Sequence, residues 1–207
     1  MNHSLILASQ SPRRAELLRQ MALPFVVLIT DVDESRQKGE APCEYVKRLA
    51  VAKCQAGFGL AESAQNIAAP LVVIGADTIV VIDDEILGKP RGLKESVAML
   101  KRLAGRTHTV LSGVAVGDGT HLESTVVSSV VTFAAMTDQQ INAYWSTGEG
   151  RDKAGSYGIQ GIGGIFVERI EGSFSSVMGL PVRETEVLLR RLNVNTWSIR
   201  SQWLKNS

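Results

Sequence analysis

Residues 71–82 read LVVIGADTIVVI and form the most hydrophobic run of the chain. The many β-branched residues of this run predict a strand. Asp77 lies within the run, where a carboxylate without a partner is energetically expensive. We therefore expect a metal ion, a cationic side chain or several hydrogen-bond donors beside Asp77. A carboxylate that caps a local turn is the alternative interpretation.

Strands and helices alternate through the first part of the chain, and long strands then follow one another through short turns. Further strands are predicted at residues 4–8, 25–29, 86–87, 107–116, 123–134 and 165–170. Helices are predicted at residues 12–21, 93–103 and 182–192, and others begin at Pro42 and Thr137. This pattern is typical of an α/β protein with a mixed sheet flanked by helices.

The chain has 207 residues, a length that suits one large domain or two small lobes. It contains no internal repeat and no linker long enough to mark a domain boundary. We expect one α/β domain over residues 1–192, which is either a single body or two lobes around a cleft. Residues 193–207 are expected to form a weakly ordered tail.

The charges of the chain nearly balance, with 22 basic and 21 acidic residues and a formal net charge of +1. So little net charge gives no overall attraction for nucleic acid or for an anionic membrane, so a polyanion must be held by a local basic cluster. No apolar run approaches the ~20 residues of a membrane span, and residues 1–8 lack the features of a signal peptide. The two cysteines have neither zinc-site nor disulfide spacing. These observations favour a cytoplasmic protein that binds neither nucleic acid nor membrane.

Residues 9–14 read SQSPRR and lie where the first predicted strand leads into the first predicted helix. Backbone N–H groups and the positive end of the helix dipole favour an anion at such a point. The hydroxyl of Ser9 and the guanidinium groups of Arg13 and Arg14 add donors that suit phosphate oxygens. A plain helix cap followed by two solvated arginines is the alternative. The chain has no P-loop pattern.

Three isolated lysines could extend this basic cluster, and one acidic side chain adds to the acidic groups. Lys53 lies on an otherwise apolar helix, Lys89 follows a strand, and Lys153 precedes a glycine-rich stretch. Together with the two arginines they could offset a triphosphate, whose charge is about −4. Glu34 adds a carboxylate in a polar loop predicted at residues 31–40. Each of these side chains, taken singly, is more often a solvated surface group.

The glycine-rich stretch at residues 155–164 reads GSYGIQGIGG. So much glycine lets the backbone approach a ligand closely, and the Gln160 amide offers a donor and an acceptor to the edge of a base. A flexible turn is the alternative interpretation of the same residues. His3, His108 and His121 are scattered along the chain, so Ser-His nucleophilic catalysis has no support.

Taken together, these motifs resemble those of the Maf family of nucleoside triphosphate pyrophosphatases. The resemblance rests on LASQSPRR at residues 7–14, GADT at 75–78, GKP at 88–90, DKAG at 152–155, GIQG at 158–161 and GLP at 179–181. Several separate motifs in the same order make a specific match, which covers about residues 5–192.

The resemblance implies a house-cleaning enzyme that hydrolyses a nucleoside triphosphate to the monophosphate and pyrophosphate. It also implies an elongated α/β fold shared with inosine triphosphate pyrophosphatases, a divalent cation (Mg²⁺ or Mn²⁺) and, in many members, a homodimer. Asp77 matches the family's catalytic acid-base position, and the positions that handle metal and phosphate are matched by Glu34, Lys53 and Lys89. Close relatives can carry two glutamates where this chain has Asp33 and Glu34, which leaves open which carboxylate reaches the metal.

Three positions separate the branches of the family. The branch that acts on dTTP and UTP carries Arg, Thr and Gln at the positions that match Arg13, Thr78 and Gln160. A sister branch that acts on 7-methyl-GTP has an aromatic residue, Gln and Glu there. The resemblance therefore implies a preference for pyrimidine triphosphates.

On this interpretation Asp77 and Glu34 hold the cation, and Asp77 orients a water molecule for attack at the α-phosphorus. The charge that builds on the pyrophosphate leaving group would be stabilised by four basic side chains, those of Arg13, Arg14, Lys53 and Lys89. The other substrate contacts would come from Ser9 and Lys153 to phosphate and from Gln160 and Thr78 to the pyrimidine.

Two other functions are open. One is a non-catalytic protein that senses nucleotides and regulates cell division; such a protein needs the basic cluster but no carboxylate buried beside it, so Asp77 argues against it. The other is a purine-selective pyrophosphatase, for ITP or 7-methyl-GTP, on the same fold. A panel of triphosphates distinguishes all three.

Overall fold

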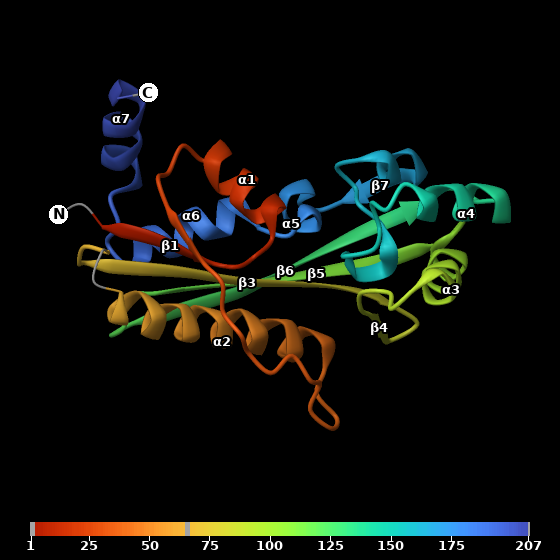
Figure 1. The fold of residues 1–207 in the computed structure, drawn as a ribbon, viewed down its shortest axis with the longest axis horizontal. Coiled ribbons are helices and arrows are strands. Elements are labelled where there is room, and N and C mark those ends of the chain that lie inside the picture. Colours follow the sequence, from red (N-terminus) through yellow and green to blue (C-terminus); the bar gives the residue numbers. More distant parts are fainter. Residues whose placement is uncertain (1–2, 65–66, 207) are drawn as a thin grey trace. The chain divides into compact units, whose positions relative to one another are not determined.

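The computed structural model describes residues 3–64 and 67–206 of the protein (Figure 1). Its strands are β1 (Ser4–Ala8), β2 (Val26–Leu28), β3 (Leu71–Ile82), β4 (Glu85–Leu87), β5 (Thr107–Gly117), β6 (Leu122–Phe133) and β7 (Val167–Glu171). Its α-helices are α1 (Pro12–Gln20), α2 (Pro42–Ser63), α3 (Leu93–Leu103), α4 (Asp138–Ser146), α5 (Phe174–Met178), α6 (Val182–Arg191) and α7 (Thr196–Asn206). Short 3₁₀ helices occur at η1 (Ala154–Ser156) and η2 (Ile162–Phe166).

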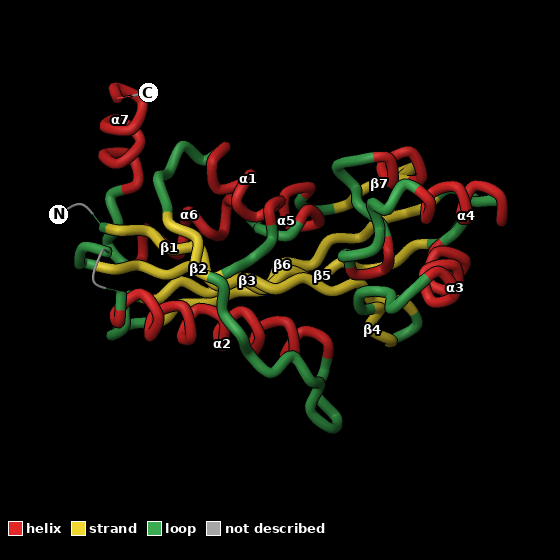
Figure 2. The backbone as a smooth tube through the Cα atoms, viewed as in Figure 1, coloured by secondary structure: helices red, strands yellow, loops and turns green. Residues whose placement is uncertain are grey.

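The described strands form one seven-stranded sheet in the order β2-β1-β3-β5-β6-β7, and β4 pairs with β3. β1 runs parallel to both β2 and β3, whereas β4 is antiparallel to β3 and β7 is antiparallel to β6. The predicted α/β class with a mixed sheet and flanking helices is therefore confirmed (Figure 2). None of the described helices combines the length and apolar character that a membrane crossing requires.

The chain divides into two compact units. The first unit comprises Met1–Asp77, Ser112–Val126 and Gly179–Ser207, and the second comprises Thr78–Leu111 and Val127–Met178. Strands β3, β5 and β6 contribute residues to both units. Each unit has a hydrophobic core of its own, as expected for compact folding units.

In the first unit, α2 covers one face of the strands, and α1 and α6 lie on the opposite face (Figure 1). Helix α2 begins at Pro42, as predicted, and its apolar residues recur at helical spacing, so they share the face turned to the sheet. The buried residues of that helix are Val46, Leu49, Ala50, Cys54, Gly57 and Ala61. They pack against β1 and β3. These two strands are parallel, and Ala8 of β1 pairs with Gly75 of β3.

The second unit is built around a cluster of aromatic rings. The Phe133 ring lies edge-on to those of Tyr157 and His108, with centroid separations of 4.7 and 5.0 Å. The Tyr144 and Phe166 rings meet in the same manner at 5.5 Å. Edge-to-face packing of this kind adds stability beyond the burial of area alone. These rings fix the segments on either side of the glycine-rich stretch.

Most predicted elements have the bounds that the sequence indicates. The strand at residues 71–82 is confirmed to the residue, and the Thr137 hydroxyl caps α4 by accepting from the Gln140 amide at 3.2 Å. Ser11 is the residue before α1, but its side chain makes no capping bond, and its amide instead donates to Ser9 Oγ at 3.2 Å. The strand predicted from residue 165 begins at Val167, because the preceding residues are in the 3₁₀ helix η2.

Within the segment predicted as a weakly ordered tail, residues 193–207, the structure places helix α7 at Thr196–Asn206, which belongs to the first unit; residue 207 lies outside the described residues. The Arg200 guanidinium bonds Glu186 of α6 at 2.6 and 3.3 Å and donates to the Met21 carbonyl at 2.8 Å. The Thr196 hydroxyl donates to the same carboxylate at 2.6 Å, and Ile199 is buried. The ion pair between Arg200 and Glu186 and the buried side chain of Ile199 therefore hold α7 in the first unit.

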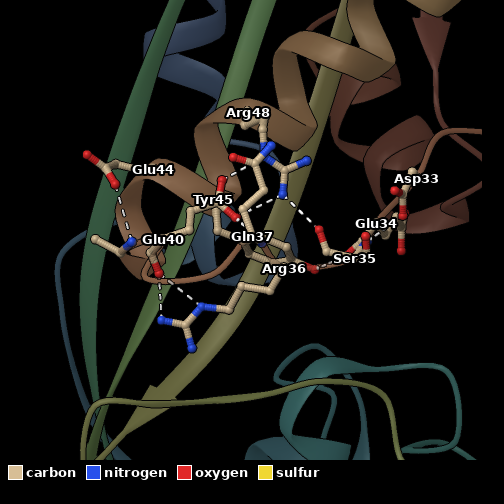
Figure 3. Close-up of polar contacts among 10 residues, drawn as sticks. Asp33, Glu34, Ser35, Arg36, Gln37, Glu40, Glu44, Tyr45 and Arg48 are labelled. Carbon is tan, nitrogen blue, oxygen red and sulfur yellow. Dashed lines mark hydrogen bonds and ion pairs between the residues drawn. The ribbon is translucent and has the colours of Figure 1, made fainter.

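A long loop leads from β2 to α2 in the first unit, where residues 31–40 are predicted and found to lack regular structure (Figure 2). Figure 3 shows that the loop is held by the first turns of α2. Arg48 Nε and Nη2 bond the two carboxylate oxygens of Glu40 at 2.6 and 2.9 Å, and Nη2 also donates to the Ser35 carbonyl at 3.0 Å. The Tyr45 hydroxyl donates to the Glu34 carbonyl at 2.7 Å. Backbone carbonyls near the start of the loop are thus tied to α2.

The Glu40 carboxylate makes the stability of this loop dependent on pH. Its bonds to Arg48 lower the pKa of Glu40 from its ordinary value of 4.5 to about 2. A lowered pKa means that the folded state favours the ionised form, so the stabilisation is complete above about pH 5 and is lost progressively as the pH falls toward about 2. We expect Glu40→Gln to lower the free energy of unfolding at neutral pH and to match the wild type more closely as the pH falls. Urea denaturation at several pH values measures the difference, with the exposed Glu62→Gln as control; a difference that does not depend on pH contradicts the assignment.

The contacts of α7 predict a second effect on stability. Arg200→Ala leaves the Glu186 carboxylate without its guanidinium in a site where the two side chains are 13% and 22% exposed. The variant should lower the free energy of unfolding by about 1–3 kcal/mol, the usual penalty for such a loss. Lys205→Ala, an exposed change on the same helix, should have little effect. Chemical denaturation compares the two, and equal stabilities would show that α7 is not docked by Arg200.

Candidate active site

The candidate site in the first unit is centred on the ammonium group of Lys53. Lys53 Nζ lies 2.7 Å from Asp77 Oδ1 and 2.6 Å from Glu34 Oε1. The Lys53 and Asp77 side chains are 11% and 12% exposed, whereas that of Glu34 is 51% exposed. The cationic partner expected for Asp77 is therefore Lys53, and the buried charge is paired.

Close packing of α2 on β3 brings these groups together. A Cβ atom added at Gly75 would lie 2.3 Å from the Ala50 carbonyl oxygen and 2.4 Å from the Cys54 amide nitrogen, so only glycine fits there. Residues 75 and 77 point to the same face of the strand, which is the face that α2 covers. Lys53 immediately precedes Cys54, so the close approach of α2 to Gly75 also brings the Lys53 side chain to Asp77.

Glu34 reaches the same point from the loop after β2. Its neighbour Asp33 turns elsewhere, because Asp33 Oδ1 accepts from the Ser35 amide at 2.8 Å and bonds with Ser35 lower the pKa of Asp33. Tyr45, which holds the Glu34 carbonyl, has a pKa raised by burial and by the nearby carboxylates of Asp77 and Glu34. Its hydroxyl therefore remains a neutral donor at physiological pH. Of the two acidic residues that the sequence left open, Glu34 is the one that lies with Asp77 at Lys53.

Arg14 links the start of α1 to the segment that precedes α6. Its Nη1 donates to Ser9 Oγ at 3.1 Å, and its Nε donates to the Gly179 carbonyl at 2.9 Å. Burial lowers the pKa of Arg14, and the Asp77 carboxylate opposes this effect. The nearby guanidinium of Arg13, in contrast to Asp77, lowers the pKa of Arg14. Of the basic pair predicted from residues 9–14, Arg14 is thus within electrostatic range of Asp77, and Arg13 is within range of Arg14.

The predicted residues fall into two sets. The first unit holds six of them, namely Ser9, Arg13, Arg14, Glu34, Lys53 and Asp77. The second unit holds the other four, namely Thr78, Lys89, Lys153 and Gln160. Within the second unit, the Gly155 amide donates to the Gly88 carbonyl at 3.1 Å, so the segments that carry Lys89 and Lys153 are adjacent. Lys153 Nζ donates to Asp152 Oδ1 at 2.8 Å and to the Glu149 carbonyl.

The donor set at Lys53 suits a divalent cation. The Asp77 and Glu34 carboxylates each place an oxygen atom against the same ammonium group, so they converge on one positive centre. Mg²⁺ in nucleotide sites usually takes one or two carboxylates and completes its ligands with water and phosphate. The described residues contain no group of three or more His, Cys, Asp or Glu side chains that could hold a metal ion alone. A cation at this site would therefore share its ligands with a phosphate-bearing substrate.

Several residues of structural importance to the site lack a distinctive sequence signal. Tyr45 and Arg48 are three positions apart and therefore share one face of α2, but such pairs are common on helices. Glu40 reads as one more acid of a polar loop. Glu149 is an isolated acid before the glycine-rich stretch, and two of its hydrogen bonds are with backbone amides, which every residue type but proline offers.

Comparisons with known proteins place the chain in a family. The model of the Maf family, described as Maf-like protein, matches residues 4–192. A dTTP/UTP pyrophosphatase of Pseudoalteromonas atlantica is 51% identical over 92% of this chain and 97% of the relative, and one of Vibrio cholerae is 49% identical over 90% and 97%. A solved structure of the Staphylococcus aureus Ham1 protein matches 63% of this chain and 71% of that chain, with 14% identity and a TM-score of 0.41. The resemblance stated from the motifs is confirmed: this chain belongs to the Maf family.

Proposed function

We propose that this protein is a nucleoside triphosphate pyrophosphatase that hydrolyses dTTP and UTP to the monophosphate and pyrophosphate. The observation that carries the proposal is the buried Asp77 carboxylate, held by Lys53 and joined there by Glu34. Relatives about half identical to this chain along nine-tenths of its length bear the name dTTP/UTP pyrophosphatase, which supports the same activity.

The reaction replaces one bond at the α-phosphorus. A water oxygen bonds to that phosphorus, the bond to the oxygen that bridges to the β-phosphorus breaks, and pyrophosphate leaves with the electron pair. Asp77 accepts the proton that the attacking water loses, a contribution of about 10²- to 10⁴-fold for a positioned general base. The Lys53 ammonium group lies 2.7 Å from Asp77 Oδ1 and holds the carboxylate in place for this role.

Basic groups balance the charge of the triphosphate. Ser9 and Arg13 contact phosphate oxygens at the start of α1, and Arg14 fixes the Ser9 hydroxyl through the bond of 3.1 Å. Preorganised donors of this kind stabilise the charge that develops on the leaving pyrophosphate without needing to reorient. We assign Lys89 and Lys153 to the same role from the second unit.

Asp77 and Glu34 would also hold Mg²⁺ or Mn²⁺. Such an ion supplies positive charge to the phosphate chain and lowers the pKa of water near the α-phosphorus. The two carboxylates come from a strand and from a loop fixed by Tyr45 and Arg48, so the loop contacts of Figure 3 bear on cation affinity.

Base recognition is assigned to Gln160, with Thr78 as the supporting residue. A uracil or thymine ring presents two carbonyl acceptors around one N–H donor. The amide of glutamine carries one acceptor and two donors, so it can match part of that edge in both senses. The formal net charge of +1 gives no overall attraction for nucleic acid or an anionic membrane, and we propose a cytoplasmic enzyme of free nucleotides. The resemblance to the Maf family is the basis on which we propose a homodimer.

Asp77→Asn tests the catalytic assignment. The amide has the same shape but accepts a proton poorly, so the variant should fold normally and lose about 10²- to 10⁴-fold in kcat. Asp138→Asn on α4, at an exposed carboxylate paired with Lys101, is the control and should keep wild-type activity. Pyrophosphate release measures kcat, and thermal unfolding verifies the fold. Full activity of Asp77→Asn would refute its role.

The substrate class is tested with a panel of triphosphates in the presence of Mg²⁺, with separation of pyrophosphate from phosphate. We expect pyrophosphate from dTTP and UTP, and the panel extends to 5-methyl-UTP and pseudo-UTP. A preference for ITP or 7-methyl-GTP would support the purine-selective alternative instead. No turnover of any triphosphate would support a nucleotide-sensing regulator.

A further inference from the structure

The glycine-rich stretch of the second unit is wrapped around one carboxylate. Glu149 Oε2 accepts from the Ile162 amide at 2.7 Å, and Glu149 Oε1 accepts from the Gly163 amide at 2.9 Å. The Tyr144 hydroxyl donates to Glu149 Oε1 at 2.7 Å and accepts from the Gly158 amide at 3.0 Å. Glu149 and Tyr144 thus bind backbone amides on both sides of Gln160.

The glycines of this segment are required by its approach to the carboxylate. A Cβ atom added at Gly161 would lie 2.1 Å from Glu149 Oε2, so a side chain at that position would displace either the loop or the carboxylate. A Cβ atom at Gly163 would lie 2.7 Å from the Tyr144 hydroxyl. The backbone of this segment is therefore anchored at Gly158, Ile162 and Gly163, and its close approach to Glu149 and Tyr144 requires glycine at 161 and 163.

The charge state of the anchor favours these bonds. Burial raises the pKa of Glu149, but the Gly163 amide, the Tyr144 hydroxyl and the Ile162 amide outweigh that effect and hold the pKa below its ordinary value. An ionised carboxylate accepts shorter and stronger hydrogen bonds than a neutral group does. Tyr144 has a pKa raised by burial and by the bond to Glu149, so its hydroxyl stays a donor.

We propose that Glu149 is a positioning residue for base recognition, which sets the place of Gln160 and through it the preference for pyrimidine triphosphates. Gln160 itself is exposed, and the anchored amides two residues before and two residues after it fix its backbone. Because an exposed side chain on a free loop would lose rotamer and backbone freedom on binding, the anchors lower the entropic cost of contacting the base. The inference rests on the proposed function, in particular on Gln160 as the group that reads the base.

The discriminating change is Glu149→Gln. In this variant an NH₂ group replaces one carboxylate oxygen. The NH₂ group is a donor and would face a backbone N–H group that is also a donor, so at least one of the anchoring hydrogen bonds is lost. We expect KM for dTTP to rise about tenfold, with kcat within about twofold of the wild type, and the ratio of kcat/KM for dTTP over ITP to fall by a similar factor. Glu171→Gln on β7, at a carboxylate exposed to solvent, is the matched control and should leave all three quantities unchanged.

A purely structural role predicts a different result. In that case Glu149→Gln would lower the fraction of active enzyme, and kcat would fall equally for all triphosphates. The ratio of kcat/KM for dTTP over ITP would not change. That result would overturn the inference. The double variant Glu149→Gln/Gln160→Ala should have the same ratio as Gln160→Ala alone, since both act through one side chain. A further drop in the double variant would also overturn it.

Failure of this inference can be distinguished from failure of the proposed function. Amide hydrogen exchange at Ile162 and Gly163 should accelerate in Glu149→Gln whether or not the protein turns over a nucleotide, and unchanged exchange overturns the anchor by itself. If Gln160→Ala keeps the wild-type dTTP/ITP ratio, positioning of the base by Gln160 is refuted while hydrolysis stands. Tyr144→Phe, which removes one hydroxyl only, should show the same changes to a smaller degree if Glu149→Gln does not fold.

Discussion

One ammonium group shared by two carboxylates is the constraint on which the candidate site depends. Lys53 comes from the middle of a long helix, Asp77 from a buried strand and Glu34 from a loop, so three elements must be in register for the contacts of 2.6 and 2.7 Å to form. A buried carboxylate is tolerated only because its charge is matched there. The same pairing brings oxygen atoms of Asp77 and Glu34 to one positively charged group.

Backbone contacts, more than side-chain pairs, hold the functional groups in place. In the first unit the absence of a side chain at Gly75 lets α2 lie directly on β3, and Tyr45 and Arg48 grip carbonyl groups beside Glu34. In the second unit a single acid, Glu149, gathers amides around Gln160. In each unit an exposed side chain, Glu34 or Gln160, thus lies on backbone that less exposed side chains hold in place.

Sequence reasoning located Asp77 because a charge inside a β-branched run is conspicuous, and it required a partner for the same reason. It could not choose Lys53 over the other lysines, since that choice depends on how closely a helix approaches a strand. Local patterns predicted most strands and the helix that Thr137 caps, but Ser11 makes no side-chain capping bond. They did not indicate α7, because its docking depends on Arg200 meeting Glu186, a residue of another helix. Bonds from side chains to backbone, such as those of Glu149, leave no pattern in the order of residues.

The central claim is that Lys53 neutralises a buried charge, and a double-mutant cycle on stability tests it most directly. The free energy of unfolding is measured for Lys53→Met in the wild-type protein and again in an Asp77→Asn background. We expect Lys53→Met to destabilise the wild type by about 1–3 kcal/mol more than it destabilises the Asp77→Asn protein, where no Asp77 carboxylate is left unpaired. An equal loss in both backgrounds, within about 0.3–0.5 kcal/mol, would contradict it.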